Sequence, residues 1–377
     1  MFSYWEQQSF SYYDHIVIGA GIVGLSAAME LKEKYSKSRI LVLERGLFPT
    51  GASTRNAGFA CMGSATELLD DLQHTPEADV VALFAARKKG LDQLRIRLGD
   101  DKIGYHANGG HELISDKEID VLDKLDYLNT LLLPVAGKSA FLPASDRIAE
   151  FGFKGTYAKA LIAHTCEGEL NSGMMMRALM DMAIQQGIEI KTGAEVTGYD
   201  ETEKKVTVHV KNPFRKEEWP LACATLTICT NAFTKQLLPN EDITPGRGQV
   251  LITDVIPGLK IKGIFHFDQG YYYFREIDGR VLFGGGRNID FAGEETTEIA
   301  LNEKIQADLE EKLRTIILPD TDHTIAQRWA GIMAFGQTKY PIVKAFSDKV
   351  FGAFRLGGMG VALGTEVARQ VVALHEL

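Results

Sequence analysis

Features that mark several classes of protein are missing from this chain of 377 residues. It has no long basic run and a formal net charge of −9, so we do not expect nucleic acid or an anionic membrane as its main partner. No stretch reaches the ~18 uninterrupted apolar residues of a membrane helix, which predicts that there is no integral membrane segment. Residues 1–13 lack a basic segment followed by an apolar one, so they are not typical of a signal peptide. These absences favour a globular, cytoplasmic protein.

Cysteine is also scarce. Cys61, Cys166, Cys223 and Cys229 form no Cys-x-x-Cys pair and no His-rich metal spacing. We therefore expect reduced thiols and no metal site. The methionines of residues 174–182 have helical spacing, which favours core packing over a soft-metal site. Cys61 lies near a predicted cofactor loop, so a functional thiol remains an alternative to a small core side chain.

The strongest positive signal is a glycine fingerprint near the N-terminus. The apolar segment 14–18 runs into Gly-x-Gly-x-x-Gly and then into a helical pattern. Gly19 allows the tight turn, Gly21 lets phosphates approach the backbone, and Gly24 lets the helix lie close to the strand. The free N–H groups and the positive end of the helix dipole favour a dinucleotide pyrophosphate.

A second apolar segment, residues 40–43, ends at Glu44, twenty residues after Gly24. An acidic side chain at this spacing accepts hydrogen bonds from a ribose 2′-OH and would repel the phosphate of NADP. A glycine-rich turn in an ordinary α/β protein would explain the glycines alone. It would leave the spacing of Glu44 as a coincidence.

The rest of the chain alternates helical and strand patterns. Helices are predicted within residues 64–99, 174–186, 297–317 and 365–374, and the region 245–286 reads as adjacent antiparallel strands. The length predicts two or three domains. The pattern as a whole indicates an α/β protein.

A second glycine-rich turn, Gly357 to Gly360, precedes the last predicted helix. Nicotinamide dehydrogenases need only the first turn, whereas an extended FAD needs backbone donors at its pyrophosphate and again at its ring. A helix N-terminus beneath the ring would stabilise the anion formed on reduction. The two turns together favour FAD over NAD.

Later segments extend the pattern in a fixed order. The motifs are the glycine fingerprint, the small-residue loop 51–58, the loop 246–249, the tyrosine-rich strand 271–273, the segment 328–333 and the turn 358–360. In this order they resemble the D-amino-acid oxidase superfamily, especially its glycine oxidase, sarcosine oxidase and γ-glutamylputrescine oxidase branch. The resemblance covers nearly the whole chain.

The resemblance implies a Rossmann-type FAD-binding domain of the glutathione-reductase-like βαβ kind, built from residues 1–85, 165–243 and 325–377. An antiparallel-sheet α+β substrate domain, residues 86–164 and 244–324, is inserted into it. The residues expected to contact FAD are Gly19, Gly21, Ile22, Val23, Gly24, Glu44, Arg45, Ser53, Arg55, Asn56, Ala57, Gly58, Val196, Thr230, Gly331, Ile332, Gly358, Met359, Gly360 and Val361.

The resemblance also implies how FAD is attached. Members with covalent flavin use a cysteine late in the chain or a histidine in the early small-residue loop. This sequence has no cysteine after Cys229, and Arg55 and Asn56 occupy the loop. Non-covalent FAD is therefore expected.

One motif departs from the family pattern. Oxidases of the glycine oxidase type read Gly-Leu-Arg-Pro where this chain has residues 331–334, Gly-Ile-Met-Ala, and their arginine grips the substrate carboxylate. Met333 cannot replace a bidentate guanidinium. Either Arg275 or another cation supplies the grip, or the substrate is an amine without an α-carboxylate. The polyamine-type branch fits the second option better.

Candidate catalytic residues lie on the tyrosine-rich strand. Tyr271, Tyr273 and Arg275 share one face by two-residue alternation, and His266 is nearby. An aromatic sheet face packed in the core is an equally simple explanation of the tyrosines. If the face lines the site, the tyrosines would hold an amine by cation–π attraction, and His266 would accept a proton or supply a positive charge.

The expected reaction is oxidation of a C–N bond of a small-molecule amine or amino acid by hydride transfer to flavin N5, followed by imine hydrolysis. Oxygen or a quinone would accept the electrons. Two alternatives stay open. A 2-hydroxy-acid dehydrogenase would need Arg275 as carboxylate grip and His266 as base, and a flavin-binding protein without turnover would need neither.

Overall fold

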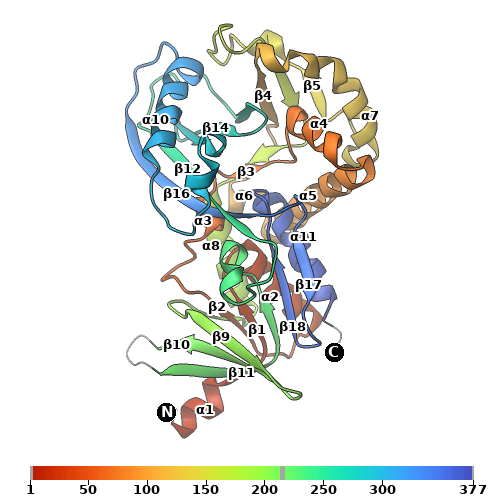
Figure 1. Cartoon of the computed structure of the whole chain (residues 1–377), viewed down its shortest axis with the longest axis vertical. Helices are drawn as coiled ribbons and strands as arrows, with labels where there is room; N and C mark the ends of the chain where they lie inside the picture. The colour runs from red at the N-terminus through yellow and green to blue at the C-terminus, as the bar shows by residue number, and fades with distance from the viewer. Residues whose placement is uncertain (1–2, 213–216, 376–377) are drawn as a thin grey trace.

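The computed structural model describes residues 3–212 and 217–375, which form two large sheets and the helices around them (Figure 1). The first sheet has the strand order β17-β18-β11-β1-β2-β8, and β10 and β9 extend it from β11. Its strands are β1 (Tyr12–Ile18), β2 (Ile40–Leu43), β8 (Glu189–Lys191), β9 (Val196–Glu201), β10 (Val206–Lys211), β11 (Glu218–Ile228), β17 (Ile342–Ala345) and β18 (Val350–Phe354).

The centre of this sheet is parallel, since β1 pairs in parallel with both β2 and β11, and β11 pairs in parallel with β18. Parallel strands are covered on both faces, which explains why β2 is buried at all four positions. The covering helices include α2 (Ile22–Lys34), α5 (Glu77–Leu98), α8 (Ser172–Gln185) and α11 (Gly360–Ala373). Helix α11 packs against both α2 and α5.

The second sheet has the order β16-β12-β15-β14-β13-β4-β6-β5 and lies in the upper half of Figure 1. Its strands are β4 (Gly110–Ile114), β5 (Phe141–Pro143), β6 (Ala160–His164), β12 (Thr244–Thr253), β13 (Ile264–Phe267), β14 (Tyr272–Ile277), β15 (Arg280–Gly285) and β16 (Ile325–Phe335). All of its pairings are antiparallel except that of β13 with β4. A small ladder of β3 (Phe59–Ala60) and β7 (Gly168–Glu169) completes the strands.

One face of the second sheet is an aromatic core. Tyr272 and Phe274 of β14 point into it with Phe265, Phe267 and Phe283. Strand alternation then turns Tyr273 and Arg275 to the opposite face, as the sequence predicts.

The remaining α-helices among the described residues are α1 (Tyr4–Phe10), α3 (Ala52–Arg55), α4 (Ala65–His74), α6 (Asp100–Ile103), α7 (Leu125–Ala136), α9 (Phe291–Glu294) and α10 (Glu303–Lys312). No helix within residues 3–212 and 217–375 combines the length and the apolar character that a bilayer span requires.

The structure confirms the α/β class and differs from the sequence-based expectation in details. The helix expected over 297–317 begins only at Glu303, because the Asn302 side chain accepts hydrogen bonds from the first free N–H groups of α10. The last helix begins at Gly360, five residues earlier than expected. Strand β16 pairs with β12 in the second sheet, whereas the expected boundary grouped residues 325–335 with the FAD-binding segments.

Candidate active site

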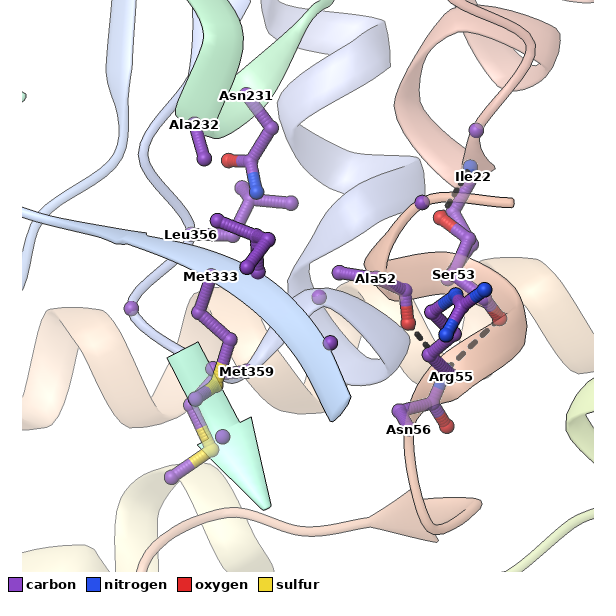
Figure 2. Close-up of a pocket in the computed structure, with 18 of the residues that line it drawn as sticks. Ile22, Ala52, Ser53, Arg55, Asn56, Asn231, Ala232, Met333, Leu356 and Met359 are labelled. Carbon is purple, nitrogen blue, oxygen red and sulfur yellow. Dashed lines mark hydrogen bonds between the residues drawn. The ribbon is translucent and has the colours of Figure 1, made fainter. Parts of the chain in front are cut away.

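A cavity of about 560 Å³ runs between the two sheets. Its lining comes from the strand ends and turns of the first sheet and from one face of β12 to β16. Figure 2 shows part of this lining, with Ile22 and Ser53 on one side and Met333 and Met359 on the other. All residues expected to contact FAD line the cavity except Gly24 and Gly58.

The first glycine turn has the geometry that the fingerprint requires. Gly19 has φ +102°, and a Cβ on it would lie 2.7 Å from the carbonyl oxygen of Cys229. A Cβ on Gly24 would lie 1.8 Å from the carbonyl oxygen of Gly19. Gly24 therefore acts by letting α2 approach the turn and does not itself line the cavity.

Glu44 directly follows β2 at the cavity wall, and its carboxylate holds the turn. One oxygen accepts a hydrogen bond of 3.0 Å from the Ala20 N–H, and the other accepts one of 2.9 Å from the Gly46 N–H. Next to it, the Arg45 guanidinium lies 3.5 Å from the centre of the Phe233 ring. Val196 lines the same end of the cavity.

The small-residue loop is held rigid by its own polar side chains (Figure 2). The Ser53 hydroxyl accepts a hydrogen bond of 3.1 Å from the Ile22 N–H at the start of α2. Arg55 donates to the carbonyl oxygens of Thr50 and Ala330, at 2.8 and 2.9 Å. This loop therefore connects the first glycine turn to β16.

The second glycine turn closes the other end of the cavity. Gly357 and Gly358 have φ +56° and +84°, and α11 begins two residues later at Gly360. A Cβ on Gly358 would lie 3.5 Å from the Met333 sulfur, so the turn contacts the face of β16. The residues present fit an elongated dinucleotide, because two glycine cradles that a Cβ would fill face one continuous cavity.

Three of the four catalytic candidates line this cavity, namely Tyr271, Tyr273 and His266. Tyr273 packs edge-on against Phe59, with ring centres 5.6 Å apart, and burial raises the pKa of its phenol to about 12. Tyr271 is 40% exposed. The tyrosine side chains of this face therefore do not belong to the aromatic core.

Arg275, the fourth candidate, does not line the cavity. Its guanidinium donates to the carbonyl oxygens of Leu170, Gly58 and Ala57 at 2.8, 3.3 and 3.4 Å. It also lies 3.4 Å from a carboxylate oxygen of Glu169. Arg275 braces the loop behind the cavity and is not placed to grip a substrate carboxylate.

His266 belongs to a buried acid–base cluster in the cavity wall. Its Nε2 lies 3.7 Å from one oxygen of Glu167, and the other oxygen lies 3.8 Å from Nε2 of His164. Burial opposes the ionisation of Glu167, but the two imidazoles and the Met62 N–H outweigh it and lower its pKa to about 2. Burial would likewise lower the pKa of His266, but the Glu167 carboxylate outweighs it and raises that pKa.

Several lining residues carry no motif and were missed by the sequence analysis. Lys339 reaches the cavity and is neutralised by Glu67 and Asp71, at 3.1 and 2.7 Å. Arg287 and Phe335 also line it, and the ring of Phe335 lies under the Arg287 guanidinium. The only sequence signal for Arg287 is its position directly after the glycine run that ends β15.

Cys61 lines the cavity but shows no sign of activation. It is buried, and burial raises the pKa of its thiol well above its ordinary value. Its sulfur lies 3.4 Å from the sulfur of Met359. These contacts agree with a small packing residue and not with a reactive thiolate.

A strand–glycine–helix turn that faces a second glycine turn across one elongated cavity defines a flavoenzyme of the dinucleotide-binding class. Residues 14–374 match the family model described as FAD dependent oxidoreductase, the DAO family. The chain belongs to this family and is an FAD-dependent oxidoreductase.

Individual relatives are distant in sequence. The chain is 23% identical over 376 residues to the probable oxidoreductase OrdL of Haemophilus influenzae, covering 96% of this chain and 82% of that protein. The structure is similar to glycine oxidase from Geobacillus kaustophilus, with a TM-score of 0.76 and 18% identity over 97% of this chain and 94% of that one. It is also similar to L-proline dehydrogenase from P. horikoshii, with a TM-score of 0.76 and 16% identity over 97% and 93% of the two chains.

Proposed function

We propose that this protein oxidises a C–N bond of a small-molecule amine or amino acid and that water then hydrolyses the imine. FAD, held without a covalent bond, would supply the chemistry by accepting a hydride at N5. The observation that carries the proposal is that one cavity is lined both by the second glycine turn and by Tyr271, Tyr273 and Met333.

The cavity wall formed by Tyr271 and Tyr273 favours the neutral form of the amine. A C–H bond next to nitrogen gives up a hydride readily only when the amine is neutral. Phenol and thioether side chains exclude water, and this desolvation lowers the pKa of an amine. The faces of Tyr271 and Tyr273 attract the amine while it is still protonated on entry.

His266 fits the role of a positive charge better than that of a base. Its pKa is raised by Glu167, which favours the protonated imidazole over the free base that would accept a proton. A buried cation in the wall stabilises negative charge that develops in the cavity. Support for a 2-hydroxy-acid dehydrogenase is correspondingly weak, because Arg275 is engaged elsewhere and His266 is not placed as a free base.

The test is anaerobic mixing of the flavin-loaded protein with a panel of amines, N-methyl amino acids and 2-hydroxy acids. We expect amines or amino acids to bleach the visible flavin absorbance and hydroxy acids to leave it unchanged. Bleaching by hydroxy acids alone would support the dehydrogenase instead. A flavin that stays oxidised with the whole panel would contradict the proposal and favour a binding protein. Re-oxidation by oxygen or by a quinone then identifies the electron acceptor.

A further inference from the structure

The charged side chains that line the cavity differ in how well they are neutralised. Arg55 donates to two carbonyl oxygens, and Lys339 lies between two carboxylates. His266 faces Glu167. Arg45 lies at the far end of the cavity, beside Glu44 and over the Phe233 ring.

Arg287, at the end of the cavity proposed to hold the substrate, is not neutralised in this way. Within residues 3–212 and 217–375 its guanidinium has no hydrogen bond or ion pair, and its Nε is buried without an acceptor. Glu294, an acidic residue nearby in sequence, already pairs with Arg247 at 2.7 Å. Burial lowers the pKa of the Arg287 guanidinium, with nearby negative groups opposing it. The folded state therefore contains a half-buried cation without a hydrogen-bond acceptor or an ion-pair partner, which is unfavourable in free energy.

Aromatic rings hold this cation in place. The Arg287 Cζ lies 4.1 Å from the centre of the Phe335 ring and 5.0 Å from that of Phe291. Stacking on rings covers the face of a guanidinium and leaves the N–H donors in its plane free. Those donors form a fork that matches the two oxygens of a carboxylate.

The position of Arg287 places this fork at the substrate end. A Cβ on Gly246 would lie 3.0 Å from the Arg287 Cζ and 2.4 Å from the Phe335 ring, so the glycine makes room for both side chains. Gly246 is the register partner of Met333, and directly paired residues of antiparallel strands share a face. Arg287 thus lies on the cavity face beside Met333, close to the second glycine turn.

We propose that Arg287 is the anion-binding residue of the substrate site and that the substrate is an amine that also carries a carboxylate. The inference rests on the proposed function and narrows its substrate class to amino acids and N-substituted amino acids. The carboxylate accepts the two in-plane N–H donors of Arg287 while the tyrosine wall holds the amine. Met333 supplies an apolar surface beside the pair and no charge.

The experiment titrates the flavin-loaded protein with benzoate, an unreactive carboxylate, and with benzamide, a neutral molecule of the same shape. Perturbation of the flavin absorbance reports binding. We expect benzoate to bind more tightly than benzamide, and Arg287→Met to weaken benzoate by roughly 30-fold or more while leaving benzamide unchanged. Arg287→Lys keeps the charge but loses the forked pair of donors, so its benzoate affinity should lie between those of the unsubstituted protein and Arg287→Met. Arg280→Gln, at the other end of β15 and outside the cavity lining, should bind benzoate like the unsubstituted protein.

Equal benzoate affinity in the unsubstituted protein and in Arg287→Met would overturn the inference, and so would a failure of the unsubstituted protein to bind benzoate. If Arg287→Met loses its flavin, the benzoate affinity of Arg287→Lys is compared with that of the unsubstituted protein instead, and equal affinities would overturn the inference. Binding needs no turnover, so the result stands even if no amine reduces the flavin, which would be a failure of the proposed function alone. If decarboxylated amines reduce the flavin as well as the parent amino acids do, the function stands and the inference fails.

Discussion

Nε2 of His266 lies 3.7 Å from a carboxylate oxygen of Glu167, and both side chains are buried in the cavity wall. Burial lowers the pKa of the second neighbour, His164, whereas Glu167 raises the pKa of His266, so Glu167 favours the protonated form at His266 and burial disfavours it at His164. A change to the Glu167–His266 pair should therefore affect both the charge in the cavity wall and the free energy of unfolding.

We first predict that Glu167→Gln changes the pH dependence of flavin reduction by substrate. Without the Glu167 carboxylate the pKa of His266 falls, because only the weaker contributions of Glu112 and Glu67 then oppose burial, so the imidazole loses its charge at a lower pH. The measurement is the anaerobic reduction rate followed over a pH series. Glu150→Gln, which removes an exposed carboxylate paired with Arg147, is the control and should leave the profile unchanged. An unchanged profile in Glu167→Gln would show that His266 does not act through its charge.

We also predict that Glu167→Gln destabilises the fold most within a limited range of pH. The Glu167 carboxyl has a pKa lowered from 4.5 to about 2, so its contribution is full above its unfolded pKa and is lost as the pH falls toward 2. The His266 pKa is raised above 6.5, so its contribution is full below that value and is lost as the pH rises through the raised pKa. The destabilisation by Glu167→Gln should therefore be largest between these limits, at about 3–5 kcal/mol, and shrink on both sides. Urea unfolding over a pH series measures it, and a difference independent of pH would contradict the assignment.

Arg275→Met should destabilise the protein without weakening carboxylate binding. The variant leaves Glu169 and three carbonyl oxygens without their shared donor, and we expect the free energy of unfolding to fall by about 3–5 kcal/mol. Thermal or urea unfolding measures the loss, with Arg314→Met, on the surface, as the matched control. A selective loss of benzoate affinity with normal stability would restore Arg275 as the carboxylate grip.

Gly24→Ala should abolish FAD retention. Its Cβ would meet the carbonyl oxygen of Gly19 at 1.8 Å, and that backbone atom cannot move without opening the turn. The flavin-to-protein absorbance ratio after purification reports the effect. Gly155→Ala, where a Cβ has open space, should keep the ratio of the unsubstituted protein. Full flavin content in Gly24→Ala would mean that the close packing of α2 is not needed.

Denaturation by acid should release all of the flavin. No cysteine or histidine lies in the loop 51–58 or in the turn 357–360, two of the segments that line the cavity. The measurement compares yellow colour in the supernatant and in the washed protein precipitate. Flavin that stays with the precipitate would demonstrate a covalent bond.

The sequence predicted the glycine turns well because their requirements are local. Gly19 needs a positive φ and Gly24 needs a close backbone contact, and both are properties of a short segment. Strand alternation also placed Tyr273 and Arg275 on one face correctly. It could not show that Leu170, Gly58 and Glu169, from distant segments, cover Arg275 and draw it away from the cavity.

Arg287 was missed for the opposite reason. Its exposure to the cavity depends on Gly246 and Phe335, which belong to other strands and lie 41 residues before it and 48 residues after it. No pattern within one segment indicates that a cation will lack a partner. Only the assembled sheet shows which carboxylates are already engaged.

The arrangement of the two glycine turns has a consequence for how the protein matures. Residues 18–61 form one wall of the cavity and residues 356–361 form another, and α11 packs on α2 to join them. During synthesis the ribosome makes the first wall long before the second. The coenzyme therefore cannot be enclosed until residue 361 has left the exit tunnel, so the first wall stays open while residues 62–355 are made.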